Sequence, residues 1–235
     1  MRNYFLMILF VLAATPCFAT FPTTGILDNF DRANESPLNN SGAWGGNIRS
    51  ASNRRMRVVS NRCANSNTGG NDSDQSYSTQ FAAGNHEVYT TYITSSTDVN
   101  RGLMLFVKIS SAFPPAASGY WLEWEGDGEL RIYRLDASTS TQLGATESLT
   151  APTNNDVVGL EALNDTNGTL NVYLNGTVVA TRTDTTYKGQ AGYIGIGQAH
   201  DPARMDDFGG GVQVAALSLS TQDRLGRRTA IGLRR

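Results

Sequence analysis

The chain has 235 residues, of which 40% are hydrophobic and 17% charged, and its formal net charge at pH 7 is −2. Five arginines fall in the last twelve residues, so residues 20–223 hold 13 basic against 21 acidic side chains, a net charge of −8. The positive charge forms no stripe interleaved with aromatic residues, which excludes the profile of a nucleic-acid-binding protein.

Residues 1–19 have the pattern of a secretory signal peptide. Arg2 is followed by an apolar run over residues 4–14 and by small residues up to Ala19, with no acidic side chain. The apolar run is too short to anchor the chain in a bilayer. We expect cleavage after Ala19 and a secreted or cell-surface product with no membrane insertion; the alternative of a lipoprotein signal at Cys17 is disfavoured by Pro16.

Strand patterns dominate the rest of the chain, and amphipathic helix patterns are nearly absent. Ten or more short strands with turn residues between them predict an all-β sandwich over residues 20–222, followed by a basic tail over residues 223–235. The predicted strands are rich in β-branched and aromatic residues and cover 26–30, 56–60, 87–94, 103–109, 120–125, 129–135, 156–163, 170–174, 177–181, 191–197 and 212–220.

The polar segment 61–80 contains almost no aliphatic residues and is predicted to be a long surface loop. Cys63 lies in this segment and is the only cysteine left after signal removal, so no intrachain disulfide is possible. Two outcomes stay open for its thiol, an intermolecular disulfide or a partly shielded free group. The basic tail is likewise either a solvated end or a segment that docks on the acidic body of a second copy.

The segment YWLEWEGDGELRIYRL, residues 120–135, is predicted to be one β-hairpin around a three-residue glycine turn. That register pairs Trp121 with Tyr133 and Glu123 with Arg131 on one face. The other face is apolar and consists of Leu122, Trp124, Leu130 and Ile132.

A second hairpin is predicted at Asn175-Gly176, the pair that a type I′ turn favours. Its register places Val172 opposite Val179 and Tyr173 opposite Val178.

Several stretches resemble the concanavalin A-like lectin/glucanase superfamily, in particular its laminin-G-like jelly-roll members. The resemblance rests on ILDNFDR (26–32) with Trp44, GYWLEWEGDGELRIYRLDAST (119–139), DVVGLEAL (156–163), TLNVYLNGTVVAT (169–181), GQAGYIGIG (189–197) and ARMDDFGGG (203–211). It implies two antiparallel sheets, one concave and one convex, with glycan-binding residues usually on the concave sheet or its rim.

The candidate binding surface is the face that carries Trp121, Tyr133, Glu123 and Arg131. Sugars pack their C–H faces on aromatic rings, and their hydroxyls need planar acceptors and donors such as carboxylate and guanidinium groups. Trp44 is a further candidate from a loop, although a lone tryptophan near a strand end also fits a core position. The alternative is that a loop or a second subunit covers this face, or that a register slip by one residue buries Trp121.

Catalytic residues are less well indicated. Glu123 and Glu125 alternate on one strand face, as in the Glu-x-Asp-x-x-Glu strand of jelly-roll β-glucanases, but the middle acid here is Glu. Their Cα separation of about 6.6 to 7 Å admits the carboxyl spacing of about 5 to 5.5 Å that retaining hydrolysis needs. The Tyr187-Lys188 and Gln198-x-His200 pairs are similar to alginate-lyase motifs but stand in the reverse order.

A structural calcium ion is a further candidate, and no other cofactor is expected. Asp28 near the first strand and Asp206 and Asp207 near the last are carboxylates of the kind that calcium takes as ligands, and the terminal strands lie close together in this fold. The alternative is that these acids cap turns. His86 and His200 have no partner at metal-ligand spacing and are predicted to lie on the surface.

The sequence therefore favours a secreted, non-catalytic carbohydrate-binding β-sandwich that recognises a glycan or surface polymer. Two alternatives remain: a structural subunit of an extracellular assembly, which forms homo-oligomers through Cys63 or the basic tail, and a polysaccharide-degrading hydrolase or lyase.

Overall fold

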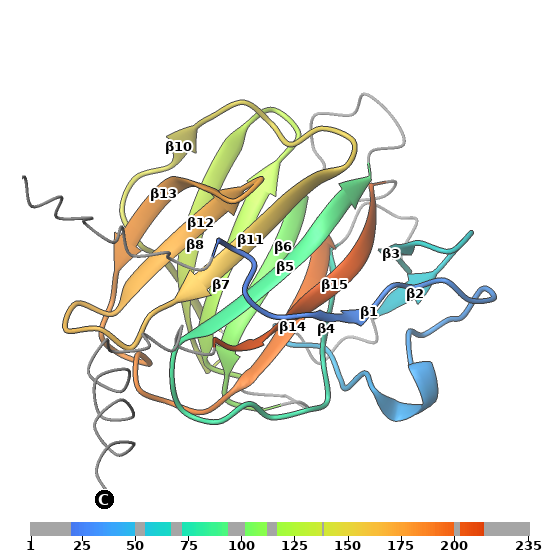
Figure 1. The fold of residues 1–235 in the computed structure, drawn as a ribbon, viewed down its shortest axis with the longest axis horizontal. Coiled ribbons are helices and arrows are strands. Elements are labelled where there is room, and N and C mark those ends of the chain that lie inside the picture. The colour runs from blue at the N-terminus through green and yellow to red at the C-terminus, as the bar shows by residue number, and fades with distance from the viewer. Residues whose placement is uncertain are drawn as a thin grey trace, which may run out of the picture. The chain divides into compact units, whose positions relative to one another are not determined.

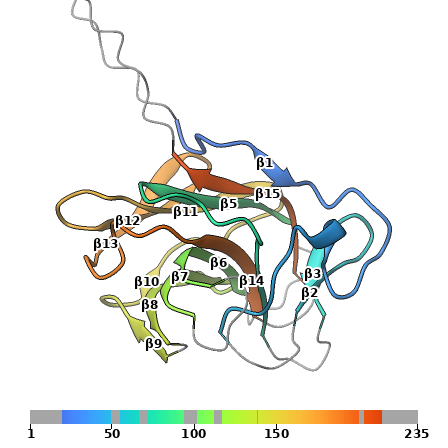
Figure 2. The ribbon, with the colours of Figure 1, turned by 90° about the horizontal axis from the view of Figure 1, so that it is seen from below.

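The computed structural model describes residues 20–49, 55–66, 72–93, 102–111, 117–137, 139–199 and 203–213. Nearly all of them belong to one compact unit, Phe21–Val214, which consists of two antiparallel β-sheets packed face to face (Figures 1 and 2). The predicted all-β sandwich is confirmed. The predicted signal peptide and basic tail lie outside the described residues. Within those residues, no helix has both the length and the apolar character needed to cross a membrane.

The first sheet has eight strands in the order β13-β12-β11-β5-β15-β3-β2, and β1 also pairs with β15. The strand bounds are β1 Ile26–Asp28, β2 Met56–Val58, β3 Cys63–Asn65, β5 His86–Ile93, β11 Asp156–Ala162, β12 Thr169–Leu174, β13 Thr177–Thr183 and β15 Arg204–Val212. A short 3₁₀ helix, Asn40–Gly42, follows β1 along the chain.

The second sheet has seven strands in the order β10-β8-β7-β6-β14-β4, and β9 also pairs with β8. Its strands are β4 Ser73–Ser76, β6 Gly102–Ile109, β7 Gly119–Glu125, β8 Glu129–Asp136, β9 Thr139–Gln142, β10 Glu147–Ser148 and β14 Tyr193–Ala199. Figure 2 shows the two sheets edge-on as separate layers, with β1, β5 and β15 in one and β6, β7 and β14 in the other.

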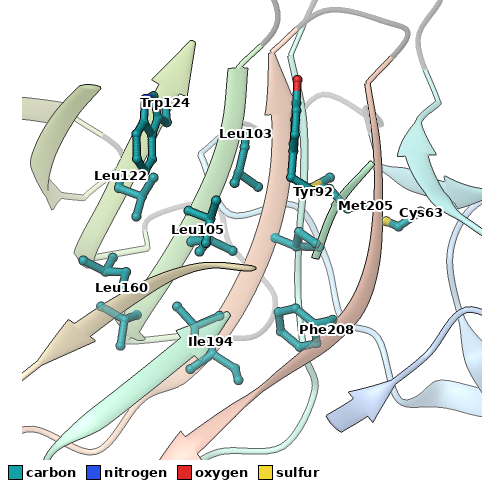
Figure 3. Packing of buried hydrophobic residues seen from close by; sticks show 14 of the residues in the cluster. Cys63, Tyr92, Leu103, Leu105, Leu122, Trp124, Leu160, Ile194, Met205 and Phe208 are labelled. Carbon is teal, nitrogen blue, oxygen red and sulfur yellow. The ribbon is translucent and has the colours of Figure 1, made fainter. Parts of the chain in front are cut away.

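The main hydrophobic core lies between the two sheets (Figure 3). Trp124 and Leu122 enter it from β7, Leu160 from β11 and Phe208 from β15, and each is at most 1% exposed. Alternate residues of each strand face this core because successive side chains of a strand point to opposite sides of the sheet. A second, smaller apolar cluster lies on the outer face of the seven-stranded sheet.

Both predicted hairpins form. In the first, Trp121 pairs with Tyr133 and Glu123 with Arg131, as the sequence predicted. In the second, Asn175 and Gly176 have φ angles of 51° and 78°, which confirms the type I′ turn.

The second hairpin differs from the prediction in one pair. Tyr173 lies opposite Val178 as expected, but Val172 lies opposite Ala180 and not Val179. A β-bulge between Val172 and Tyr173 adds one residue to the facing strand, and such a bulge leaves no mark in the alternation of residue types.

The prediction of a long surface loop over residues 61–80 is wrong. Strands β3 and β4 form there, and all their residues are buried. Their polar side chains are satisfied internally: the Ser73 hydroxyl donates to the Asn65 side chain, and the Gln75 amide donates to two backbone carbonyl groups. Burying a polar group costs little free energy when the group is fully hydrogen-bonded. The polar residue types of this segment therefore did not indicate that it is exposed.

The predicted strand 212–220 overlaps the last described strand, β15, at Val212, and its residues from 214 onward lie outside the described chain. One further expectation needs correction. His86, predicted to be a surface residue, is completely buried at the start of β5.

Cys63 is 0% exposed and belongs to the main core, where it lies near Met205 (Figure 3). Burial raises the pKa of its thiol far above the usual value. We therefore expect Cys63 to be unreactive toward a disulfide reagent such as Ellman's reagent in the native protein and to react fully after unfolding in guanidinium. Rapid labelling of the native protein, or a disulfide-linked dimer on a non-reducing gel, would contradict this position.

His86 predicts a pH dependence of stability. Burial, with a further contribution from the Lys108 charge, lowers the pKa of His86 to about 4, against 6.5 for the free side chain. Between about pH 4 and pH 6.5 the unfolded chain binds more protons than the folded chain. The free energy of unfolding therefore falls as the pH drops from about 6.5 to about 4. The full loss is about 3 kcal/mol. Chemical denaturation across this range should show the slope, and a His86→Gln variant should flatten it; an unchanged slope in that variant would contradict the assignment.

Candidate functional site

The candidate site lies on the outer face of the seven-stranded sheet, where β6, β7 and β8 run side by side. The β7–β8 register turns Trp121, Tyr133, Glu123 and Arg131 to this face, as predicted. The residues between them, such as Leu122 and Trp124, face the core. The predicted division of the hairpin into two chemically different faces is therefore confirmed.

The aromatic side chains of this face form a row of stacked rings. The rings of Trp121 and Tyr133 are 4.2 Å apart at 11°, and the ring of Phe106 follows on the other side of Trp121 at 5.8 Å. The Arg49 guanidinium carbon lies 4.7 Å from the Trp121 ring centre. Trp121 is therefore only 4% exposed, and it offers no open ring surface. Tyr133, at the end of the row, remains partly exposed.

Arg49 reaches this face because Asp74 fixes the chain before it. The Asp74 carboxylate accepts hydrogen bonds from the backbone N–H of Ile48 at 2.6 Å and from Nε of Arg49 at 2.9 Å. Asp72 adds an ion pair with Arg49 at 3.1 Å. Sequence reasoning missed this contribution, because residues 48–49 lie more than seventy positions from Trp121 and no local pattern links the two segments.

Glu123 is the acid of this face with the fewest partners. Its side chain is 13% exposed, and the one ion pair that it makes with a described residue is with Nη1 of Arg131 at 3.8 Å, beyond hydrogen-bond distance. No residue of the described chain donates a hydrogen bond to its carboxylate. Burial, followed by the charge of Glu125, raises the pKa of Glu123. This carboxylate is therefore an acceptor that the described residues leave available to a ligand.

Arg131 is held in place by two other acids. Its Nη1 donates to Glu125 at 2.5 Å, and its Nη2 donates to Glu129. Glu125, Asp127 and Glu129 bring carboxylate oxygens within 4.8 Å of one another. Because the Arg131 guanidinium pairs with two of these acids, it supplies positive charge to the cluster.

The two catalytic candidates, Glu123 and Glu125, project from β7 on the same face. Glu125 is bound by Arg131, whereas Glu123 accepts no hydrogen bond from the described residues. Retaining hydrolysis needs two carboxyl groups that both reach the scissile bond. Of the Glu123 and Glu125 carboxyl groups, only that of Glu123 is free of a hydrogen bond within the described residues. Of the lyase-like residues, Gln198 is buried, Tyr187 donates to Asp136, and His200 lies outside the described residues.

Trp44, a predicted ligand-binding candidate, does not reach this face. It is 4% exposed, packs against Phe30 and Phe208 in the main core, and donates from Nε1 to Asp28 at 2.7 Å. It takes the core position that the sequence left open as its alternative.

The structure brings two of the three predicted calcium ligands, Asp28 and Asp207, to one depression, but Asp28 and Asp206 are engaged by other groups. Asp28 is buried and already accepts hydrogen bonds from Phe30, Arg32, Asn40 and Trp44. Asp206 pairs with Arg62 at 2.9 Å. Asp207 borders a depression of about 520 Å³ together with Asp28. Because the donor groups of neighbouring side chains occupy Asp28, the set of Asp28, Asp206 and Asp207 does not fit a calcium ion.

Comparison with known proteins supports the fold and leaves the ligand unnamed. No protein-family model matches the chain, and no curated protein matches it. Among solved structures, the carbohydrate-binding module CBM66 from Bacillus subtilis is similar at a TM-score of 0.54 and 12% identity. The match covers 74% of this chain and 98% of that one. The chain has the concanavalin A-like sandwich fold.

Two lectin-like structures agree with this assignment. The carbohydrate recognition domain of Emp46p, in a potassium-bound form, matches at a TM-score of 0.51 and 11% identity, covering 76% of this chain and 100% of that one. A legume lectin-like domain from Entamoeba histolytica matches at 0.50 and 11% identity, covering 69% and 88%. At such identities the likeness concerns the fold alone, and the laminin-G-like assignment stays a prediction.

Truncation of the two stacked rings should have unequal effects on stability. Trp121→Ala removes a buried ring that contacts Phe106, Tyr133 and Arg49, and we expect the free energy of unfolding to fall by about 3 to 5 kcal/mol. Tyr133→Ala should cost clearly less because its ring is partly exposed. Denaturant unfolding of both variants measures the difference, and an equal loss would mean that Trp121 does not have the buried role assigned to it.

Proposed function

We propose that this is a secreted carbohydrate-binding protein that takes its glycan on the outer face of the seven-stranded sheet, beside Tyr133, Glu123 and Arg131. The observation that carries the proposal is the Glu123 carboxylate, which lies next to a partly exposed aromatic ring and has no hydrogen-bond donor within the described chain. The similarity of the fold to carbohydrate-binding and lectin-like domains supports it.

The chemistry of these three side chains suits a sugar. The exposed part of the Tyr133 ring packs against the C–H face of a pyranose or furanose. The Glu123 carboxylate accepts hydrogen bonds from neighbouring hydroxyl groups, and those bonds offset its unfavourable burial. Arg131, fixed by Glu125 and Glu129, presents its remaining N–H groups without a large loss of conformational entropy.

The proposal is for binding without catalysis. A polysaccharide hydrolase would need a second carboxyl group beside Glu123, and Glu125 is bound by Arg131. The hydrolase or lyase alternative is tested by incubating the protein with the polysaccharides that it binds and measuring the release of reducing ends and unsaturated uronates.

A glycan array followed by calorimetry tests the proposal. We expect the wild-type protein to bind a defined set of glycans. Glu123→Gln should weaken that binding by about tenfold or more, since hydrogen bonds to charged groups contribute about 1.5 to 3 kcal/mol. Tyr133→Ala should weaken it by about tenfold or more because it removes the ring on which the sugar packs. Glu147→Gln serves as a matched control, because Glu147 lies on the edge strand β10, paired with Arg182. Binding that both site variants retain in full, or an array without any bound glycan, would refute the proposal.

A further inference from the structure

The first residues of the described chain lie across the outer face of the other, eight-stranded sheet. Residues Phe21–Thr24, here called the N-terminal strap, precede β1 and form no strand of their own. Figure 1 shows this segment in blue, passing in front of the eight-stranded sheet before it enters β1, and Figure 2 shows it on the outer side of that layer. The strap is therefore held by side-chain contacts and not by strand pairing.

Phe21 fits a slot that is shaped for its ring. The ring stacks on Tyr173 of β12 at 4.0 Å and 4°, and it meets Tyr89 of β5 edge-on at 6.3 Å. The floor of the slot is Gly159 of β11, where a Cβ atom would lie 2.1 Å from the Phe21 ring. Glycine at this position is thus required by the close approach of the ring, and Phe21 is only 7% exposed.

Glu87 of β5 binds the next part of the strap. Its carboxylate accepts hydrogen bonds from the backbone N–H and the hydroxyl of Thr23 at 2.7 and 3.0 Å, and from the same two groups of Thr24 at 2.6 Å each. Tyr89 donates to the Thr24 carbonyl at 3.0 Å. Glu87 is 0% exposed, so its charge depends on these donors for solvation.

A second buried acid supports this arrangement. Gln213 donates to both Glu87, at 3.0 Å, and Glu161, at 2.6 Å. The Tyr173 hydroxyl in turn donates a hydrogen bond to Glu161 at 2.9 Å, which orients the ring on which Phe21 stacks. We define the strap groove as Glu87, Tyr89, Gly159, Glu161 and Tyr173. The strap groove binds both an aromatic side chain, Phe21, and the polar groups of Thr23 and Thr24, as a peptide-binding site does.

The strap has the features of a separable ligand. It stands at one end of the compact unit and is joined to β1 only through Gly25, around whose Cβ position no atom lies within 4 Å. Ile26, directly after this junction, is 55% exposed and is one of the two large hydrophobic residues exposed in the described chain. Every copy of the chain carries one strap and one groove of matching chemistry.

We propose that the strap groove is a binding site for the Phe-Pro-Thr-Thr segment and that a second copy of the chain supplies this segment in trans, so that two copies exchange straps. The site is separate from the proposed glycan face, because it lies on the opposite sheet. Its partner is another copy of this chain, recognised through the aromatic slot and the Glu87 carboxylate.

Complementation between two full-chain variants tests this. The acceptor variant, Phe21→Ala with Thr23→Gly and Thr24→Gly, keeps the groove but has no functional strap. The donor variant, Gly159→Val, keeps the strap but fills its own slot. Each should be monomeric alone, and an equimolar mixture should form a 1:1 complex of twice the mass in size-exclusion chromatography with light scattering. Adding Phe21→Ala to the donor provides the matched control and should abolish the complex.

A fluorescent peptide with the sequence of residues 20–25 gives a second measurement on the acceptor alone. It should bind in a saturable manner and raise the melting temperature, and the same peptide with alanine in place of phenylalanine should do neither. If the triple variant does not fold, Phe21→Ala alone serves as the acceptor. The absence of the mixed complex with a folded acceptor overturns strap exchange, and the absence of peptide binding overturns the groove itself.

Discussion

The pairing of β7 with β8 is the constraint on which the rest of the molecule depends. The turn at residues 126–128 fixes Trp121 opposite Tyr133 and Trp124 opposite Leu130, which sends alternate residues to the core and to the outer face. Slippage of β7 by one residue would bring Glu123 into the core and expose Trp124. The glycine turn, with Gly128 at a φ of 93°, therefore decides both the packing of the sandwich and the chemistry of its outer surface.

The sequence predicted those features that depend on local alternation and turn chemistry. The two faces of the β7–β8 hairpin and the Asn175-Gly176 turn follow from residue types within a few positions of each other. The candidate residues Glu123, Arg131 and Tyr133 were found in this way. Trp121 was placed on the correct face, and its ring is covered by the segment that carries Arg49, which agrees with the alternative that a loop covers this face.

The errors share a physical cause, which is contact between distant segments. Arg49 covers Trp121, and no local pattern in the chain links these two residues. The strands β3 and β4 were predicted to be a surface loop because most of their residues are polar, but those side chains bond to one another and to the backbone inside the fold. The strap was missed for the same reason, since Glu87 lies more than sixty residues from Thr23 and Thr24.

The two outer faces of the sandwich have different roles in this account. On the eight-stranded sheet, the aromatic rings and buried acids are engaged by the chain's own N-terminal strap. On the seven-stranded sheet, Glu123 keeps acceptor capacity that the described residues do not use. A glycan is therefore expected on the seven-stranded sheet. The proposed glycan face and the strap groove share no residue, so each proposal can be tested independently of the other.

The account depends most directly on the pKa of Glu123. NMR of the side-chain carboxyl carbon of Glu123 as a function of pH measures this pKa. In the free protein the pKa of Glu123 should lie above the ordinary value for glutamate, because burial and Glu125 disfavour its charge. A glycan identified by the array should lower that pKa on binding, since hydroxyl donors stabilise the carboxylate. A bound glycan that leaves the pKa of Glu123 unchanged would contradict the account.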